Sequence, residues 1–197
     1  MATPPDSDRR TSIAEWAMLN TFELLDDRDQ EAERLPLFTI QAVIDRDVHN
    51  VCLGLWEGTD VACFDLRRGS GNQRTNSTGA AIAFPYGLPT VLILHGSVSE
   101  DHRMLLSMPV VDDHALADRY EVRSQNAGFT RALLDRPLVD WLLEWRALPP
   151  PVSFELSQDW LLAFAPQLPV DLFPQLLDGL LGFRDHIPTD VLTMFGR

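Results

Sequence analysis

The sequence predicts an α+β fold, consisting mainly of an antiparallel sheet with an amphipathic N-terminal helix and C-terminal helices. Segments with the two-residue alternation typical of strands follow one another through the middle of the chain, whereas helical patterns lie towards its two ends. The chain has 197 residues, of which 45% are hydrophobic and 23% are charged. A globular chain of this length and composition can close a core without disulfides or a structural metal.

The beginning of the chain predicts three successive parts. Residues 1–10 are polar and are expected to form a disordered tail. Ser12 followed by Glu15 is a capping-box pattern, which predicts a helix that starts there and ends near Leu25. The charged run 26–34 predicts a solvated acidic linker. The expected division of the chain is therefore a tail, 1–10, a helix and linker, 11–34, and a single α+β domain, 35–197.

The predicted N-terminal helix carries apolar side chains on or beside one face, namely Ile13, Met18, Phe22 and Leu25. Burying a Leu or Phe side chain is worth ~1.5–3 kcal/mol, so these residues should contact either their own domain or another chain. The opposite face is acidic, which argues against docking on an anionic membrane. The domain that follows has enough elements to close its own core. We therefore expect a protein partner or a second copy of the chain to bind these four residues.

Strand patterns begin near residue 38 and are interrupted by a polar, glycine-rich loop at 68–79. The predicted strands are 39–44, 48–56, 60–67, 80–84, 90–95, 105–110 and 119–124. The predicted C-terminal elements are helices at 127–134 and 137–145, a hairpin of strands 152–156 and 160–165, and a helix from 171 to about 186.

The charge and the basic residues of the chain exclude several classes of function. A net charge of −13 opposes binding to nucleic acids and to anionic membrane surfaces. All 16 basic residues are arginine, so the chain alone lacks the lysine that P-loop, pyridoxal-phosphate and kinase chemistry require. The first residues show no secretory signal, and no apolar run approaches the ~18 residues that cross a bilayer. We expect a soluble, cytoplasmic chain with no cofactor, no nucleic-acid partner and no membrane span.

The two cysteines are expected to face each other across a hairpin. If Glu57–Gly58 forms a two-residue turn, the strand register places Cys52 directly opposite Cys63. A cross-strand disulfide or a thiol switch is one interpretation. We favour two reduced, buried cysteines, because cytosolic thiols stay reduced and behave as small apolar side chains.

Histidines and aspartates form the only candidate catalytic or metal-binding groups. They are His95 and the pairs Asp101–His102, Asp113–His114 and Asp185–His186. Such groups can ligate a metal or act as an acid–base pair. Adjacent loop residues point in different directions, however, and the chain has no Gly-x-Ser-x-Gly nucleophile elbow. We therefore predict no catalytic residue and no metal site, and keep a metal-dependent hydrolase as the alternative.

The loop after residue 66 holds three arginines among glycines, Arg67, Arg68 and Arg74. Backbone amides and guanidinium groups of this kind can hold a phosphate, so these residues are a candidate anion-binding site. The third glycine of a dinucleotide-binding fingerprint is replaced by Arg74. We favour the simpler interpretation, a flexible connection between strands whose charges keep it soluble.

The order of segments also resembles a known bacterial family. The segments that carry the resemblance are Leu35-Pro-Leu-Phe38, 51–67, 120–135, 154–164 and Ile187-Pro188. The family consists mostly of proteins from high-GC Gram-positive organisms, has no assigned activity, and in longer members its soluble domain often follows membrane helices. The resemblance implies a soluble domain and supplies no functional residue. Together with the missing catalytic motifs, it leads us to expect a non-enzymatic interaction or regulatory domain.

Overall fold

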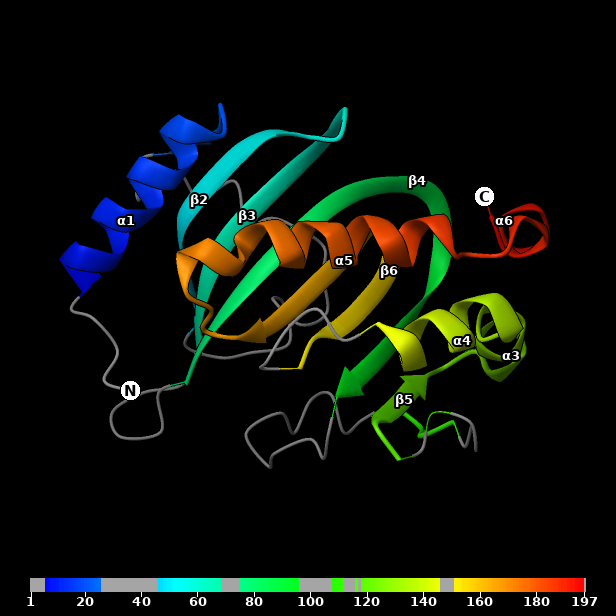
Figure 1. Cartoon of the computed structure of the whole chain (residues 1–197). Coiled ribbons are helices and arrows are strands. Elements are labelled where there is room, and N and C mark those ends of the chain that lie inside the picture. The colour runs from blue at the N-terminus through cyan, green and yellow to red at the C-terminus, as the bar shows by residue number, and fades with distance from the viewer. Residues whose placement is uncertain are drawn as a thin grey trace.

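The computed structural model shows an α+β fold in which a curved antiparallel sheet carries one helix at the N-terminal end and several at the C-terminal end (Figure 1). The structure describes residues 6–25, 46–68, 75–95, 108–111, 116, 118–145 and 151–196. The predicted fold class is confirmed. The predicted strand 39–44 and most of 105–110, as well as the linker 26–34, lie outside the described residues.

Six strands form the sheet: β1 (Glu23–Leu24), β2 (Arg46–Trp56), β3 (Thr59–Arg68), β4 (Thr75–His95), β5 (Tyr120–Ser124) and β6 (Ser153–Pro166). Their order is β1-β2-β3-β4-β5, and β6 pairs with β4. The long strand β4 pairs with β3 over its first part and with β5 over its last part. Strand β6 lies antiparallel to β4 and pairs with it along most of the length of β4.

The sheet bends where β4 and β6 lose their regular register, between Ala83 and Val91. Gly87 and Gln158 adopt positive φ angles of 57° and 54° there. Irregularities of this kind bend a strand and increase its twist. The predicted hairpin of 152–156 and 160–165 is therefore wrong, because the polar residues around Gln158 form a bulge within one continuous strand. The strands predicted at 80–84 and 90–95 are likewise parts of one strand.

The helices are α1 (Asp6–Leu19), α3 (Ala127–Leu133), α4 (Arg136–Glu144), α5 (Phe173–Asp185) and α6 (Thr189–Phe195), with a short 3-10 turn η5 (Val170–Leu172) before α5. Helix α1 begins and ends earlier than predicted. The Ser12 hydroxyl donates to the Asp8 carbonyl instead of capping the helix. At the other end the chain turns at Thr21, whose φ is 59°, and enters β1.

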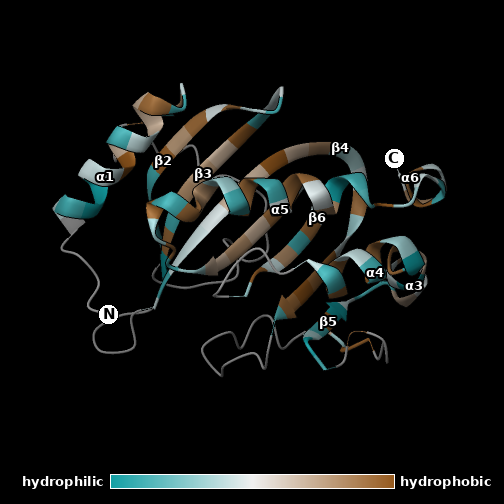
Figure 2. Cartoon of the chain, in the orientation of Figure 1, coloured by the Kyte–Doolittle hydropathy of each residue, from teal (hydrophilic) through white to brown (hydrophobic). Residues whose placement is uncertain are grey.

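Helices α1 and α5 pack on one face of the sheet, which we call the inner face. The main core lies between them and the sheet and includes Cys52, Phe154, Phe173 and Phe183. Side chains that alternate with these point to the other, outer face, where a smaller cluster forms. It consists of Val48, Val51, Phe64, Leu66, Ala81, Leu92, Leu94, Met108, Leu162 and Phe164. The sheet therefore carries apolar side chains on both faces, and Figure 2 shows hydrophobic residues recurring along β2, β3 and β4.

Helix α4 contacts α5 through two tryptophans that lie on glycines. A Cβ atom on Gly182 would lie 2.7 Å from the Cζ2 atom of Trp141, and Gly179 lies in the same way under Trp145. The two indole rings stack on each other with centroids 5.5 Å apart. These glycines let the helices approach closely, and the tryptophans belong to the packing of the core.

Candidate functional site

Helix α1 docks on the inner face of its own sheet. Ile13, Ala17 and Phe22 are buried in the main core. The ring of Trp16 lies 4.8 Å from that of Phe22 and 5.2 Å from that of Phe173, measured between centroids. Helix α1 is therefore part of the domain's core.

The four residues predicted to bind a partner have different surroundings. Ile13 and Phe22 are covered by the domain itself, so the expectation that a partner contacts them is corrected. Leu25 is half-buried and packs against the outer-face cluster. Met18 is 75% exposed, because it lies on the side of the helix turned away from the sheet. The four residues do not share one helix face, because α1 ends at Leu19 and the chain reverses before Phe22.

The Phe22 ring lies directly on the backbone of β2. A Cβ atom on Gly54 would lie 2.6 Å from Cγ of Phe22, closer than two such atoms can approach. Only glycine at position 54 leaves room for the ring. Residues of β1 then pair with β2, with Glu23 opposite Leu53 and Leu24 opposite Cys52.

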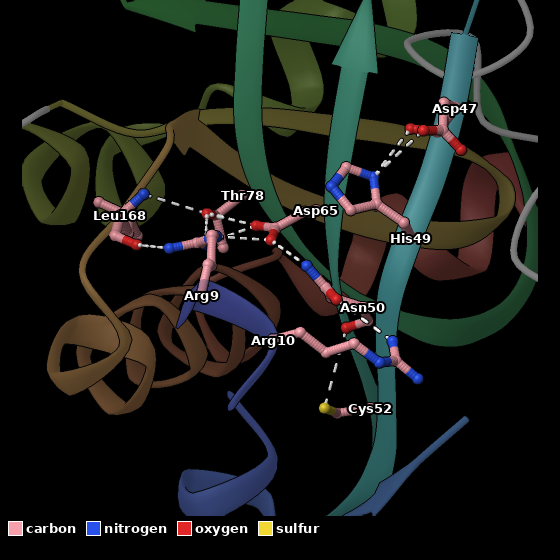
Figure 3. Close-up of polar contacts among 9 residues, drawn as sticks. All are labelled: Arg9, Arg10, Asp47, His49, Asn50, Cys52, Asp65, Thr78 and Leu168. Carbon is pink, nitrogen blue, oxygen red and sulfur yellow. Dashed lines mark hydrogen bonds and ion pairs between the residues drawn. The ribbon is translucent and has the colours of Figure 1, made fainter. Parts of the chain in front are cut away.

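A buried ion pair joins α1 to the sheet (Figure 3). Arg9 donates from Nε to Oδ2 of Asp65 and from Nη2 to Oδ1, each at 2.6 Å. Its Nη1 donates to the Leu168 carbonyl at 2.8 Å. Arg9 is 6% exposed and Asp65 is 1% exposed, so both charges are removed from water. A fork of this geometry is the strongest form of carboxylate–guanidinium contact.

The remaining acceptor positions of Asp65 are also occupied. Asn50 donates from Nδ2 to Oδ2 at 2.9 Å, and the Thr78 hydroxyl donates to Oδ1 at 3.1 Å. Each carboxylate oxygen thus accepts two hydrogen bonds, which fills the roughly four sites of an ionised carboxylate. Asp65 consequently holds structure together and has no free position for a metal ion or a reacting proton.

Arg10 adds a second connection on the neighbouring side of α1. Its Nη1 donates to Oδ1 of Asn50 at 3.3 Å, and its Nη2 donates to the Leu25 carbonyl at 3.2 Å. Asn50 has a φ of 53° at the irregularity in β2, a conformation that asparagine tolerates better than most residues. Arg9 and Arg10 fall in the segment that we predicted to be a disordered tail, and the structure places them in α1.

Cys52 and Cys63 face each other across β2 and β3, as the turn predicted. Both are free and buried. Burial raises the pKa of the Cys52 thiol to about 12, and burial also raises the pKa of Cys63. Such thiols stay protonated and are poor nucleophiles and metal ligands. The predicted reduced pair is confirmed in this structure.

The candidate anion site is not assembled within the described residues. Arg67 and Arg68 are neighbours on β3 and point to opposite faces of the sheet. Arg67 pairs with Asp47 at 3.4 Å, while the Arg68 guanidinium is buried over the Phe164 ring. Burial lowers the pKa of Arg68 to about 10. Arg74 lies outside the described residues.

The two candidate histidines that the structure describes, His95 and His186, have separate surroundings. Nδ1 of His186 contacts the Gly182 carbonyl at 2.7 Å, and its ring stacks on Trp141. His95 packs its ring edge-on against Tyr120, and partial burial, followed by the nearby Arg119, lowers its pKa. The pairs Asp101–His102 and Asp113–His114 lie outside the described residues. Over the described ranges, no three His, Cys, Asp or Glu side chains group so that they could hold a metal ion.

Comparisons with known proteins find a likeness in fold. No model of a protein family matches the chain, and no curated protein matches it in sequence. A solved structure, the mycobacterial trehalose monomycolate transport factor A, TtfA, superposes with a TM-score of 0.64 over 91% of this chain and 96% of that one. The two sequences are 18% identical. At this identity the likeness shows a shared fold alone.

In the part of the chain that the structure describes, no helix has the length and apolar character needed to span a membrane.

Proposed function

We propose that this chain is a non-enzymatic interaction domain that acts as an accessory component by binding another protein. The observation that carries the proposal is the exposure of large apolar side chains on a well-packed domain. Leu53 and Leu55, two residues apart on β2, are 38% and 59% exposed. Contiguous apolar surface of this kind marks binding sites in soluble proteins.

The chemistry of the described polar groups supports the same proposal. Asp65, the most deeply buried aspartate described, has its four acceptor positions filled by neighbouring side chains. The two thiols are protonated and buried, and His186 is held against α5 and Trp141. A transport factor with the same fold is consistent with an accessory role. We further propose that the chain works in the reducing cytoplasm, where Cys52 and Cys63 remain unbonded.

The test compares binding with catalysis in the purified full chain. We expect affinity purification from the native organism to recover a partner protein with the full chain. Turnover of an ester or phosphoester substrate that requires a divalent metal and is abolished by His95→Ala or His186→Ala would contradict the proposal in favour of a metal-dependent hydrolase.

A further inference from the structure

The outer face of the sheet is apolar and open near the β2–β3 turn. We call this surface the outer-face patch and define it as Leu53, Leu55, Ala62, Ala83 and Trp160. Leu55 and Ala83 are exposed, Leu53 is 38% exposed, and the other two residues are half-buried. Further along the same face, the side chains of the outer-face cluster are buried.

Strand register makes these residues neighbours. Leu53 pairs with Ala62, which pairs with Ala81 on β4. Two residues further along β4, Ala83 pairs with Trp160 on β6. The residues of the patch therefore lie on four adjacent strands, which together span about 15 Å at the usual strand spacing. Ala83 lies beyond Ala81, where the pairing of β3 with β4 ends.

The pattern of β2 shows that this exposure departs from an ordinary solvated sheet face. A sheet that meets water on one side alternates apolar and polar residues, whereas a strand buried on both sides is apolar throughout. In β2, Cys52, Gly54 and Trp56 face inwards, while Leu53 and Leu55 face outwards. Residues 51–56 of β2 thus have the sequence of a doubly covered strand, but the outer side of the strand is uncovered at this end.

Acidic side chains flank the two leucines of the patch. Glu23 is paired with Leu53, Asp60 is paired with Leu55, and Glu57 lies in the turn, and all three are exposed. Arg184 reaches the hairpin from the inner side, where it donates to the Thr59 hydroxyl. None of the described residues that pair with a patch residue across neighbouring strands is an arginine.

We propose that the outer-face patch binds an amphipathic helix of another protein, whose apolar stripe is flanked by Arg or Lys. This inference rests on the proposed function and names the chemistry of its partner. A helix about 10 Å in diameter fits the width of the patch, and α5 already packs in this manner on the inner face. The acidic rim selects basic flanks, because opposite charges around an apolar centre favour the encounter and fix its orientation.

Repulsion between like charges disfavours two other occupants of this surface, a second copy of the chain and an anionic membrane. A second copy placed face to face would bring its own Glu23, Glu57 and Asp60 against this rim, and each chain carries a net charge of −13. An anionic membrane meets the same repulsion. A basic helix is the occupant that complements both the apolar centre and its acidic edge.

The test measures binding of labelled synthetic helical peptides of about 18 residues to the full chain by fluorescence anisotropy. The peptides share one Leu/Ala stripe and differ only in flanks of Arg, Gln or Glu. We expect the Arg-flanked peptide to bind about tenfold or more tightly than the Glu-flanked one, and this preference to shrink when salt rises from about 50 to about 500 mM.

Three variants locate the site. We expect Leu53→Asn with Leu55→Asn to weaken binding of the Arg-flanked peptide by about tenfold or more. Glu57→Gln with Asp60→Asn should reduce the preference for Arg flanks while retaining the fold. The matched control is Met18→Ser with Leu19→Ser, which removes two exposed apolar side chains from α1 and should leave binding unchanged. Thermal unfolding of each variant checks that it is folded.

Four results would overturn the proposal: no peptide binds, all three peptides bind equally, the α1 control loses binding as strongly as the β2 variant, or the chain dimerises through the patch in sedimentation analysis. A partner from the native organism that binds through Met18 and Leu19 alone would leave the proposed function intact and refute this inference. Metal-dependent turnover would refute the proposed function by itself.

Discussion

The ion pair between Arg9 and Asp65 should be a main determinant of stability, since it connects α1 to β3 inside the protein. Arg9→Met keeps an unbranched apolar stem and removes the guanidinium group, leaving the Asp65 carboxylate buried with only Asn50 and Thr78 as donors. Removing one partner of a buried pair typically costs ~3–5 kcal/mol. We expect a loss of this size in the free energy of unfolding.

A double-mutant cycle measures the interaction itself. Asp65→Asn alone should also destabilise the protein, because it leaves the Arg9 charge buried without its partner. The combination with Arg9→Met should cost clearly less than the sum of the two single changes, because the double variant leaves no unpaired charge. Urea denaturation followed by tryptophan fluorescence gives the four free energies. Single losses below ~1 kcal/mol, the size of an exposed pair, or strictly additive effects would refute the reasoning.

Three further predictions concern the docking of α1 and the cysteine pair. Removing α1 should lower the melting temperature and increase binding of a hydrophobic dye, since the main core loses its cover, and an unchanged melting temperature would contradict this. Gly54→Val should displace the Phe22 ring and lower the free energy of unfolding, measured by urea denaturation, by ~1–3 kcal/mol. A Cβ atom on Gly128 would meet only Oδ1 of Asn126, at 3.5 Å, so the control Gly128→Ala should be neutral or slightly stabilising. Because burial raises the pKa of Cys52 to about 12, both Cys52 and Cys63 should react with a thiol reagent at neutral pH only after unfolding, and rapid labelling of the native chain would show that they are not buried thiols.

Features governed by local chemistry were predictable from the sequence. The register of Cys52 and Cys63 follows from the turn between their strands, where Glu57 and Gly58 adopt φ angles of 49° and 77°. Positive φ at both central positions defines the tight hairpin turn that the residues suggested. The grouping of strands in the middle of the chain likewise predicted the fold class, since alternation is a local property.

Features that depend on distant partners were not predictable in the same way. Gln158 and its polar neighbours have the composition of a turn, yet pairing with the bent strand β4 keeps them within β6. The capping-box pattern at Ser12 was outweighed by the burial of Arg9, whose partner Asp65 is 56 residues away. A signal for that partner was present: Asp65 is a charged residue inside an apolar strand, which indicates a buried, paired carboxylate.

The same reasoning explains the error over the partner of α1. The apolar residues of α1 do require cover, and the sequence alone leaves open whether the domain or another chain provides it. The ion pair and the contact of Phe22 with Gly54 select the domain. The surface that we propose for a partner is the outer-face patch, which lies on the sheet instead of the helix.

The central claim, that a partner protein covers the outer-face patch, is tested most directly by site-specific photo-crosslinking in the native organism. A photoreactive amino acid replaces Leu55 in one strain and the exposed Thr11 of α1 in a control strain. We predict a covalent adduct with a distinct protein from position 55, joined through a segment rich in Arg or Lys, and none from position 11. An adduct with a second copy of the chain, or no adduct from position 55 in a folded and expressed protein, would contradict the account.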